Sequence, residues 1–329
     1  MTKEIKYIEK VEIKGLWNKF DIEWNLNKDV NILSGGNGSG KSTILDAIYD
    51  LLIRPQQIIA TDTIESINIS FNNGKKALLH FVIVDKDDIP KYIQVDKHFT
   101  ETIEMGLKKY GDVKFKIALM PNDIGMNEIS QNININAIST FDTELNQAEE
   151  IQKLDNNIQT DLDFEIYKLQ KDYISYQLNI AKRKDIITET SKNIKKEITK
   201  IRKPQNDFLG IIDTCFAETN KKINREKNEI SFLVDDTEIT AYQLSSGEKQ
   251  LLIILLKTLI QDNKQSILFL DEPEISLHID WQKQLIGFIR QLNPNVQIIM
   301  ATHSPAMIMN GWLDKVFNVS DLIVPKSKL

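Results

Sequence analysis

A glycine-rich stretch of nine residues, from Gly35 to Thr43, reads GGNGSGKST. Four of the 13 glycines in the chain lie between Gly35 and Gly40, so the backbone there can take left-handed φ angles and approach a ligand closely. The spacing of the glycines, Lys41 and Ser42 fits the P-loop pattern, in which backbone N–H groups surround phosphates, the lysine reaches the terminal ones and the hydroxyl binds Mg²⁺. A chance match is expected in about one chain in a hundred of this length. The alternative is a flexible Gly/Ser turn without a ligand.

The segments on either side of this stretch favour the P-loop. The apolar run Val30 to Leu33 is typical of a buried strand, and Ser42 to Leu52 has the spacing of an amphipathic helix. A strand, a loop and a helix N-terminus follow in the order that a phosphate site requires, because the helix N-terminus attracts anions. The residues predicted to bind ATP, with Ser42 also a ligand of Mg²⁺, are Gly35, Asn37, Gly38, Ser39, Gly40, Lys41, Ser42 and Thr43.

The composition is that of a globular protein, with 41% hydrophobic and 27% charged residues. No apolar stretch approaches the roughly 18 residues of a membrane span, and the first ten residues lack the apolar core of a signal peptide, so we expect a cytoplasmic protein with no membrane partner. The lone Cys215 excludes an intrachain disulfide, and no His/Cys cluster suggests zinc. The net charge of −6 argues against a wholly basic nucleic-acid binder but allows a local basic surface.

The first half of the chain is rich in strand patterns. Asn72-Asn73-Gly74 is a strong hairpin turn signal between two apolar runs, so we predict an antiparallel accessory sheet. Trp17 and Phe20 are candidates for stacking on an adenine, although a plain core role is favoured for each. The expected strands lie within residues 4–34, 64–71, 77–84, 89–98 and 113–119.

From Ile151 to Ile201 the apolar residues recur three or four apart, which indicates an amphipathic helix. A single straight helix of that length would extend about 75 Å, so the segment forms either a projecting arm or a hairpin folded back near Asn179. Its later part, residues 182–203, has nine Lys/Arg against three Asp/Glu. A solvated helix face is the favoured interpretation of this basic patch, and contact with DNA phosphates or docking of a partner are the alternatives.

The helical segment is expected to end at Pro204, which would interrupt the pattern. A second helix is then expected from Asn206 to roughly Lys227. A hairpin from Glu229 to Leu244 should follow it, with its turn at Asp235-Asp236.

Two apolar strands in the last quarter of the chain end in chemically active residues. Residues 267–270, ILFL, are followed by Asp271 and Glu272, and an unpaired carboxylate at the end of a buried strand is costly unless it has a ligand. In a P-loop fold we expect Asp271 to bind Mg²⁺ and Glu272 to orient or deprotonate the attacking water. The strand at 296–300 leads to His303, which can hydrogen-bond a γ-phosphate. The predicted catalytic residues are Lys41, Glu272 and His303.

A third conspicuous segment, Leu244 to Gln250, reads LSSGEKQ and precedes a helix-forming run. By itself it is an ordinary helix N-cap or an anion site. It resembles the signature motif of ABC-type ATPases, and GGNGSGKST, LSSGEKQ, ILFLDEP and ATHSP follow in the order of that family. The resemblance implies that ATP joins two nucleotide domains across the D-loop, residues 275–278, and that hydrolysis releases them. It also implies that the γ-phosphate on one P-loop is contacted by the second copy's Ser245, Ser246 and Gly247.

Within that family, DEPEISLH and ATHSP resemble the SMC, RecF and OLD-type branch rather than transporter domains. The resemblance implies an α/β fold, an ABC-type P-loop ATPase head with an antiparallel accessory sheet and a helical, short coiled-coil insertion. It divides the chain into the N-terminal half of the head at 1–142, the insertion at 143–228 and the C-terminal half of the head at 229–329. The Q-loop would lie near Ser139 to Asp142, where the chain has no glutamine.

Only 24 residues follow Pro305, too few for the TOPRIM nuclease of OLD proteins, so we expect any nuclease activity to come from another protein. The short insertion and the lack of an effector domain are similar to the ATPase subunit of the PARIS phage-defence system. We therefore predict a slow, Mg²⁺-dependent ATPase whose nucleotide-dependent homo-oligomer is a sensor or scaffold for a separately encoded effector in bacterial phage defence. The alternative is a RecF- or SMC-like DNA-binding ATPase in DNA repair or maintenance, and a transporter energiser fits the motifs least well.

Overall fold

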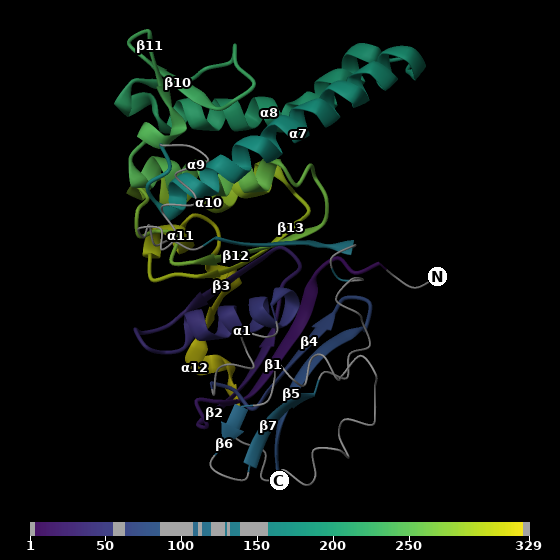
Figure 1. Cartoon of the computed structure of the whole chain (residues 1–329), viewed down its shortest axis with the longest axis vertical. Helices are drawn as coiled ribbons and strands as arrows, with labels where there is room; N and C mark the ends of the chain where they lie inside the picture. The colour runs from purple at the N-terminus through teal and green to yellow at the C-terminus, as the bar shows by residue number, and fades with distance from the viewer. Residues whose placement is uncertain are drawn as a thin grey trace.

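The computed structural model describes residues 4–54, 63–85, 108–110, 114–119, 129, 132–138 and 157–324. An antiparallel sheet lies at one end of the molecule, a parallel sheet in the middle and a layer of helices at the other end (Figure 1). A helical arm projects from the helical layer. The architecture is the predicted α/β head with an accessory sheet and a helical insertion.

The parallel sheet lies at the centre of the head. Its strands are ordered β14-β3-β13-β12-β8, and every neighbouring pair is parallel. They are β3 (Val30–Ser34), β8 (Asn134–Ile138), β12 (Ser266–Asp271), β13 (Val296–Ala301) and β14 (Val316–Asn318). All six residues of β13 are buried, as expected for a parallel strand covered on both faces. The carboxyl ends of β3, β12 and β13 meet at one edge, which is where open α/β sheets bind ligands.

Helices cover both faces of this sheet. Leu268 and Leu270 of β12 pack with the helical layer, whereas Ile267 and Phe269 pack with the antiparallel sheet and α1. The helix α1 (Lys41–Ile53) lies between the two sheets and contacts both. On the other face lie α9 (Ser246–Leu259) and α10 (Ile279–Leu292). The short C-terminal helices are α11 (Pro305–Met309) and α12 (Val319–Leu322).

The antiparallel sheet confirms the predicted accessory sheet. Its strands, in sheet order, are β15 (Ile323–Val324), β2 (Phe20–Asn25), β1 (Ile8–Leu16), β4 (Ser66–Phe71), β5 (Lys76–Asp85), β7 (Lys114–Leu119) and β6 (Lys108–Tyr110). The expected hairpin joins β4 to β5, where Gly74 has a φ of 84° and its N–H donates to the Phe71 carbonyl over 2.9 Å. The strand expected at 89–98 lies outside the described residues.

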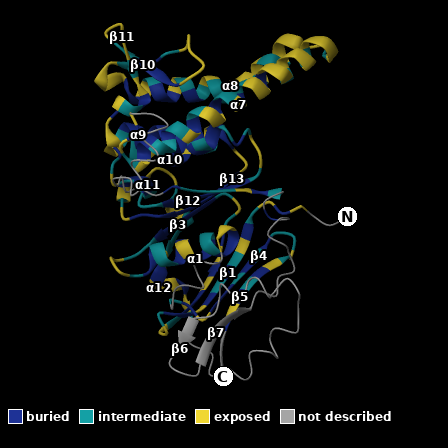
Figure 2. Ribbon diagram, viewed as in Figure 1, coloured by how far each residue is buried: buried dark blue, intermediate teal, exposed yellow. Residues whose placement is uncertain are grey.

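The arm is an α-helical hairpin of α7 (Asp161–Thr190) and α8 (Ile194–Cys215). Thr160 and Asp163 form a capping box at the start of α7. At the tip the Asn193 N–H donates to the Ser191 hydroxyl over 3.1 Å, so both residues favour a turn over continued helix. Figure 2 shows that burial falls from the base of the arm to an exposed tip.

Two details of the helical prediction were wrong. The chain folds back at residues 191–193 rather than near Asn179, because the apolar face of α7 continues to pack beyond that point, with Ile180 buried. The second helix begins at Ile194 instead of Asn206, includes Pro204, and ends at Cys215 rather than near Lys227. The arm is therefore both projecting and folded back, so the two alternatives left open are combined.

A small sheet follows the arm. It consists of β9 (Lys221–Ile223), β10 (Ser231–Val234) and β11 (Thr237–Thr240). The predicted hairpin is confirmed, since β10 and β11 are joined through Asp235 and Asp236, which have φ angles of 46° and 65°. The 3₁₀ turns are at Ala217–Thr219, Ala241–Gln243 and Leu313–Lys315.

The base of the arm is joined to α9 by two ion pairs, of which the first is buried and the second half-buried. Lys249 Nζ lies 2.8 Å from Asp163 Oδ1, and Lys257 Nζ lies 2.6 Å from Glu165 Oε1. Both lysines belong to α9, which begins within the LSSGEKQ segment, and Lys249 is part of that segment, so the arm and the segment are parts of one packed unit. None of the helices in the described residues is long and apolar enough to cross a membrane.

Candidate nucleotide-binding site

The P-loop connects β3 to α1 and takes the conformation that its glycines predict. Gly35, Gly38 and Gly40 have φ angles of 150°, 72° and 101°, which side chains with a Cβ rarely adopt. Gly40 is the N-cap of α1, and a Cβ added there would lie 2.9 Å from the ring of Trp17. The loop therefore needs glycine both for its backbone angles and for the close approach of Trp17.

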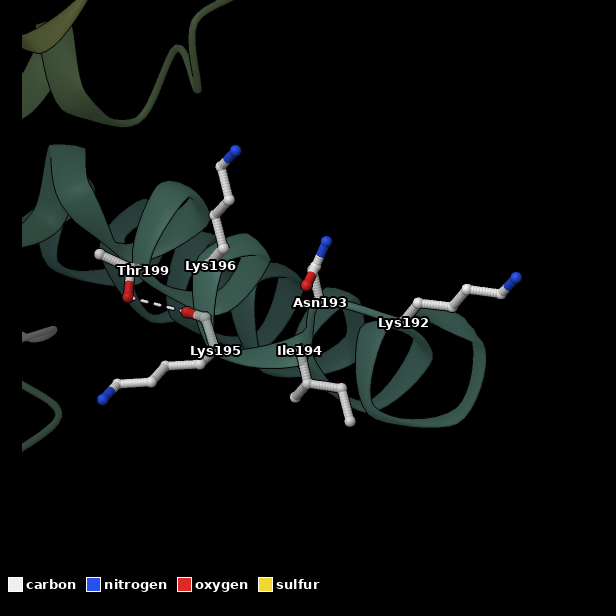
Figure 3. Close-up of a pocket in the computed structure, with 6 residues that line it drawn as sticks. All are labelled: Lys192, Asn193, Ile194, Lys195, Lys196 and Thr199. Atoms are coloured by element: carbon white, nitrogen blue, oxygen red, sulfur yellow. Dashed lines mark hydrogen bonds between the residues drawn. The ribbon is translucent and has the colours of Figure 1, made fainter.

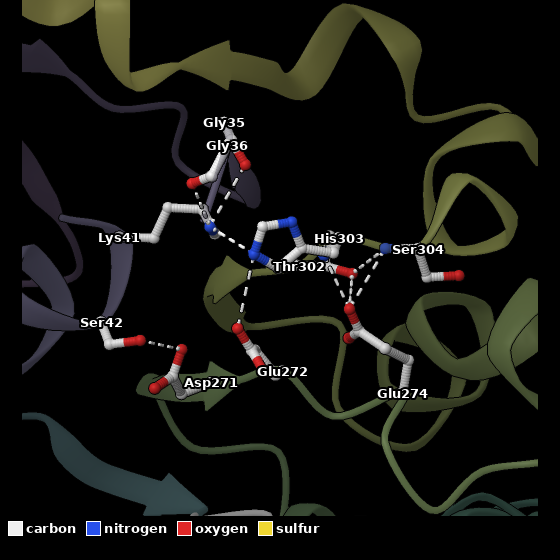
Figure 4. A network of polar contacts seen from close by, with 10 residues as sticks. All are labelled: Gly35, Gly36, Lys41, Ser42, Asp271, Glu272, Glu274, Thr302, His303 and Ser304. Atoms are coloured by element: carbon white, nitrogen blue, oxygen red, sulfur yellow. Dashed lines mark hydrogen bonds and ion pairs between the residues drawn. The ribbon is translucent and has the colours of Figure 1, made fainter. Parts of the chain in front are cut away.

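Lys41, the first residue of α1, is buried, and its ammonium lies across the loop (Figure 4). Its Nζ donates to the carbonyls of Gly35 and Gly36 over 3.2 and 3.3 Å and lies 2.6 Å from His303 Nε2. Because an ammonium has only donors, His303 accepts at Nε2, which places the proton of the neutral ring on Nδ1. The P-loop lysine and the histidine that follows β13 are thus in direct contact.

Ser42 and Asp271 meet on the other side of the loop. The Ser42 hydroxyl donates to Asp271 Oδ1 over 3.1 Å. Burial raises the pKa of the Asp271 carboxyl; the bond from Ser42 partly opposes this, and the negative charge of Glu272 adds to it. A hydroxyl beside a partly buried carboxylate is a hard oxygen donor set, which fits Mg²⁺ held by few protein ligands together with phosphate oxygens and water.

Glu272 follows Asp271 at the end of β12 and has a φ of 46°, a costly conformation for a residue with a side chain. Its N–H donates to the Ala301 carbonyl over 2.9 Å, which fixes the backbone against β13. Its Oε1 lies 3.5 Å from His303 Nε2, too far for a good hydrogen bond. The strained backbone therefore directs this carboxylate toward His303 and Lys41, as Figure 4 shows.

A residue that the sequence reasoning did not single out organises the histidine loop. Glu274 Oε1 accepts hydrogen bonds from the Thr302 hydroxyl and the His303 N–H, each over 2.7 Å, and from the Ser304 N–H over 3.1 Å. Gln282 adds a second link, because its Oε1 accepts from the Ser304 hydroxyl over 2.6 Å. The signal in the sequence was a second carboxylate just after Asp271 and Glu272, but its partners lie 28 to 30 residues further on.

These groups surround a pocket of about 440 Å³ at the carboxyl edge of the parallel sheet. Trp17 was predicted as a stacking or core residue, and its half-buried ring lines the pocket while packing on the antiparallel core. Phe20 packs on that core only. The residues that line the pocket are Trp17, Asn37, Gly38, Gly40, Lys41, Ser42, Thr43, Glu272 and His303. Gly35 and Ser39 are not part of this lining, and a Cβ on Gly35 would lie 2.8 Å from Ser39 Oγ.

The LSSGEKQ segment does not contribute to this pocket. Ser245 is the N-cap of α9, and Ser245 and Ser246 are exposed. Gly247 packs so closely against the 275–278 loop that a Cβ would lie 2.2 Å from the Ser276 carbonyl oxygen. Ser245, Ser246 and Gly247 are absent from the pocket lining, so the P-loop and this segment of the same chain are separate.

Glu248 holds the LSSGEKQ segment in place. It accepts hydrogen bonds from the Thr219 hydroxyl and the Lys221 ammonium, both over 2.9 Å, and from the Ser245 N–H over 2.9 Å. Burial raises the pKa of the Glu248 carboxyl, but these bonds outweigh it and leave the pKa below its ordinary value. The exposed serines are therefore presented from a rigid, fully bonded base.

Two further expectations concern the surroundings of the site. The predicted D-loop is a turn that leads into α10, with Ile275 and His278 exposed and Leu277 buried. The Q-loop position at 139–142 lies outside the described residues. Among the described residues, no group of three or more His, Cys, Asp or Glu side chains could hold a metal ion.

Comparison with known proteins agrees with this geometry. Residues 15–61 match a family described as the P-loop containing region of AAA domain. The Septu protein PtuA of Bacillus thuringiensis is 24% identical over 94% of this chain and 74% of its own length. The Retron Ec83 probable ATPase of Escherichia coli is 23% identical over 89% of this chain and 68% of its own length.

A relative of another kind is the DNA replication and repair protein RecF of Clostridium botulinum strain Langeland, 26% identical over 78% of this chain and 68% of its own length. These matches confirm the predicted resemblance to ATPases of the RecF-like branch. The model of a second family matches residues 130–309, more than half of the chain, which include the LSSGEKQ, ILFLDEP and ATHSP segments. The chain therefore belongs to the family described as AAA domain, putative AbiEii toxin, Type IV TA system.

Proposed function

We propose that this protein binds and hydrolyses ATP with Mg²⁺ in the pocket at the carboxyl edge of the parallel sheet. The observation that carries the proposal is the convergence of the P-loop, the end of β12 and the loop after β13 on one pocket. When ATP binds, Lys41 exchanges its contacts with the loop carbonyls for the terminal phosphates. The backbone N–H groups of the loop and of the first turn of α1 bind the phosphates.

Mg²⁺ would be held by Ser42 and Asp271, and when bound it neutralises the charge that develops on the phosphates. Glu272 orients or deprotonates the attacking water, and its strained φ keeps the carboxylate directed into the pocket. Once Lys41 has moved from its Nε2, His303 donates a hydrogen bond to a γ-phosphate oxygen in the tautomer that carries its proton on this nitrogen.

We further propose that the complete site needs two copies of the chain. The support is that Ser245 and Ser246 are exposed, rigidly held and outside their own chain's pocket. In the proposed dimer, they and Gly247 contact the γ-phosphate bound to the second copy, and the exposed D-loop lies at the interface. Bound ATP then joins the two copies, and its hydrolysis lets the copies separate.

The biological role that we propose is a cytoplasmic sensor or scaffold for a separately encoded effector in bacterial phage defence. The resemblance to the PARIS ATPase subunit and the relatives named for Septu and a retron support it. The useful output of such a switch is its state of association, so we expect slow hydrolysis. Purifying the tagged chain from its native host and identifying the proteins that accompany it tests this role.

Oligomer size with and without ATP tests the proposed chemistry. Lys41→Ala should abolish nucleotide binding and leave the size independent of ATP. Glu272→Gln should bind ATP normally but accumulate the associated form, because hydrolysis no longer separates the copies. Hydrolysis by Glu272→Gln at the wild-type rate would contradict the assignment of the base.

The second candidate function is ATP-dependent DNA repair or maintenance. It is favoured by the RecF relative and by the basic segment of the arm. The two roles predict different losses when the gene is deleted from its host. Deletion of a defence protein lowers survival of phage infection and leaves survival of DNA damage unchanged. Deletion of a repair protein lowers survival of DNA damage and leaves survival of phage infection unchanged.

A further inference from the structure

The outer part of the arm has a charge opposite to that of the rest of the protein. Residues 182–203 hold nine Lys/Arg against three Asp/Glu, a net charge of +6 in a chain of −6. The remainder of the chain therefore carries −12. The net charge of that remainder repels a polyanion, whereas the outer part of the arm, which projects away from the head, attracts it (Figure 1).

Most of these cations make no ion pair within the part of the chain that the structure describes. In the described chain, Arg183 pairs with Asp262 over 2.8 Å, and Lys203 pairs with Asp207. The other seven are exposed and make no ion pair with any described residue. They are Lys182, Lys184, Lys192, Lys195, Lys196, Lys200 and Arg202. These seven cations, distributed around the projecting part of the arm, are available to an external ligand.

Their arrangement favours a long ligand over a small anion. Figure 3 shows that the ammonium groups of Lys192, Lys195 and Lys196 point outward in different directions instead of converging on one point. On α8, Lys196 and Lys200 are one helical turn apart and so follow each other along one face, separated by about 6 Å. Successive cations along a rigid rod match a ligand with repeated negative charges.

The residue types distinguish between forms of nucleic acid. Residues 182–203 contain no aromatic side chain, so they offer no platform on which unpaired bases could stack. They also lack the aromatic and apolar anchors of a strong protein interface, apart from the exposed Ile186 and Ile194. A backbone of phosphates is what such a surface contacts best, and a duplex presents it most densely.

We propose that residues 182–203 of the arm bind the phosphate backbone of a nucleic-acid duplex, without sequence specificity. This contact lies outside the ATPase site and does not require bound nucleotide. In a defence protein this contact would allow the arm to sense nucleic acid, and in a DNA-maintenance protein it would allow the arm to hold the nucleic acid.

The test is fluorescence anisotropy of the full chain with a labelled 30-base-pair DNA of mixed sequence, titrated at several KCl concentrations without nucleotide. The variant Lys195→Glu, Lys196→Glu, Lys200→Glu reverses three exposed, unpaired arm charges. The matched control, Lys6→Glu, Lys14→Glu, Lys28→Glu, makes the same change in net charge at exposed sites on the head. Circular dichroism checks that both variants keep their helix content.

The arm variant should bind DNA at least tenfold more weakly in 100 mM KCl, and its slope of log affinity against log salt should be smaller by about 3. The head control should stay within threefold of wild type. Single-stranded DNA should bind more weakly than the duplex, and duplex RNA of the same length shows whether the site discriminates between the two duplexes. Lys41→Ala should bind DNA as wild type does, so failure of the ATPase proposal is distinguishable from failure of this one.

Three results would overturn the inference. The first is wild-type protein that does not bind the duplex at micromolar concentration in 50 mM KCl. The second is an arm variant that binds like the head control. The third is equal competition by poly-L-glutamate at the same charge concentration, which would identify the arm as a site for an acidic protein.

Discussion

The hydrogen bonds of Glu274 give the sharpest test of how the histidine loop is positioned. Glu274→Ala removes the acceptor of three bonds, from the Thr302 hydroxyl and from the N–H groups of His303 and Ser304. Hydrogen bonds to a charged group contribute about 1.5–3 kcal/mol each when buried. His303 is exposed and its N–H can bond to water instead, so we expect the free energy of unfolding to fall by only about 2 kcal/mol.

The effect on catalysis should be larger than the effect on folding. A displacement of about 1 Å at a reacting group can cost 100-fold in rate, so we expect Glu274→Ala to lower kcat about 100-fold. The P-loop and Ser42 are untouched, and the KM for ATP should change less than threefold. Glu274→Gln keeps a carbonyl oxygen at the accepting position and should lose tenfold or less.

Steady-state ATP hydrolysis and urea unfolding of the same preparations measure both effects. Glu226→Ala removes an exposed carboxylate away from the site and serves as the matched control. Two results would refute the positioning role: a kcat for Glu274→Ala within threefold of wild type, or equal losses in the alanine and glutamine variants. The second result would mean that the charge of Glu274 acts directly, instead of through the loop.

The parts of the site that sequence reasoning found are those that local patterns determine. GGNGSGKST holds its glycines, Lys41 and Ser42 within nine residues, and Asp271 and Glu272 mark the end of a fully apolar strand. Glu274 was missed because its role depends on β12 and β13 pairing side by side, a tertiary fact that spacing along the chain does not contain. Trp17 was named as a stacking candidate with a core role favoured, and spacing could not decide between the two, because its place beside Gly40 depends on the packing of the turn after β1.

The turn at the tip of the arm shows a second reason why the sequence did not predict the whole fold. Its apolar spacing runs on through residues 191–193, so periodicity alone gave no turn there. The available signal was the pair Ser191 and Asn193, whose side chains compete with helical hydrogen bonds. Pro204 was expected to end a helix, yet α8 continues through it because its apolar face, with Phe208 and Ile212 buried, packs on the head.

Three further predictions follow from the contacts. Burial raises the pKa of Asp271, so its ionisation destabilises the folded apoprotein as pH rises from the unfolded pKa through the folded one. Asp271→Asn should therefore have a higher melting temperature than wild type at pH 7 without nucleotide. A difference in melting temperature that did not become smaller toward pH 4 would contradict this. Lys249→Met leaves the buried Asp163 unpaired and should cost about 3 kcal/mol in urea unfolding, with a loss under 1 kcal/mol counting against the ion pair. Gly247→Ala puts a Cβ against the Ser276 carbonyl and should cost about 1–3 kcal/mol, whereas unchanged stability would show that the loop is free to move.

The central claim is that ATP is shared between two copies of the chain. Lys41→Ala should inactivate the P-loop and Ser246→Arg should block the exposed LSSGEKQ segment, so each variant alone should hydrolyse no ATP. In an equal mixture, half of the dimers combine the two variants and hold one intact site each, so about a quarter of the wild-type rate should return. A mixture as inactive as its separate components would contradict the account.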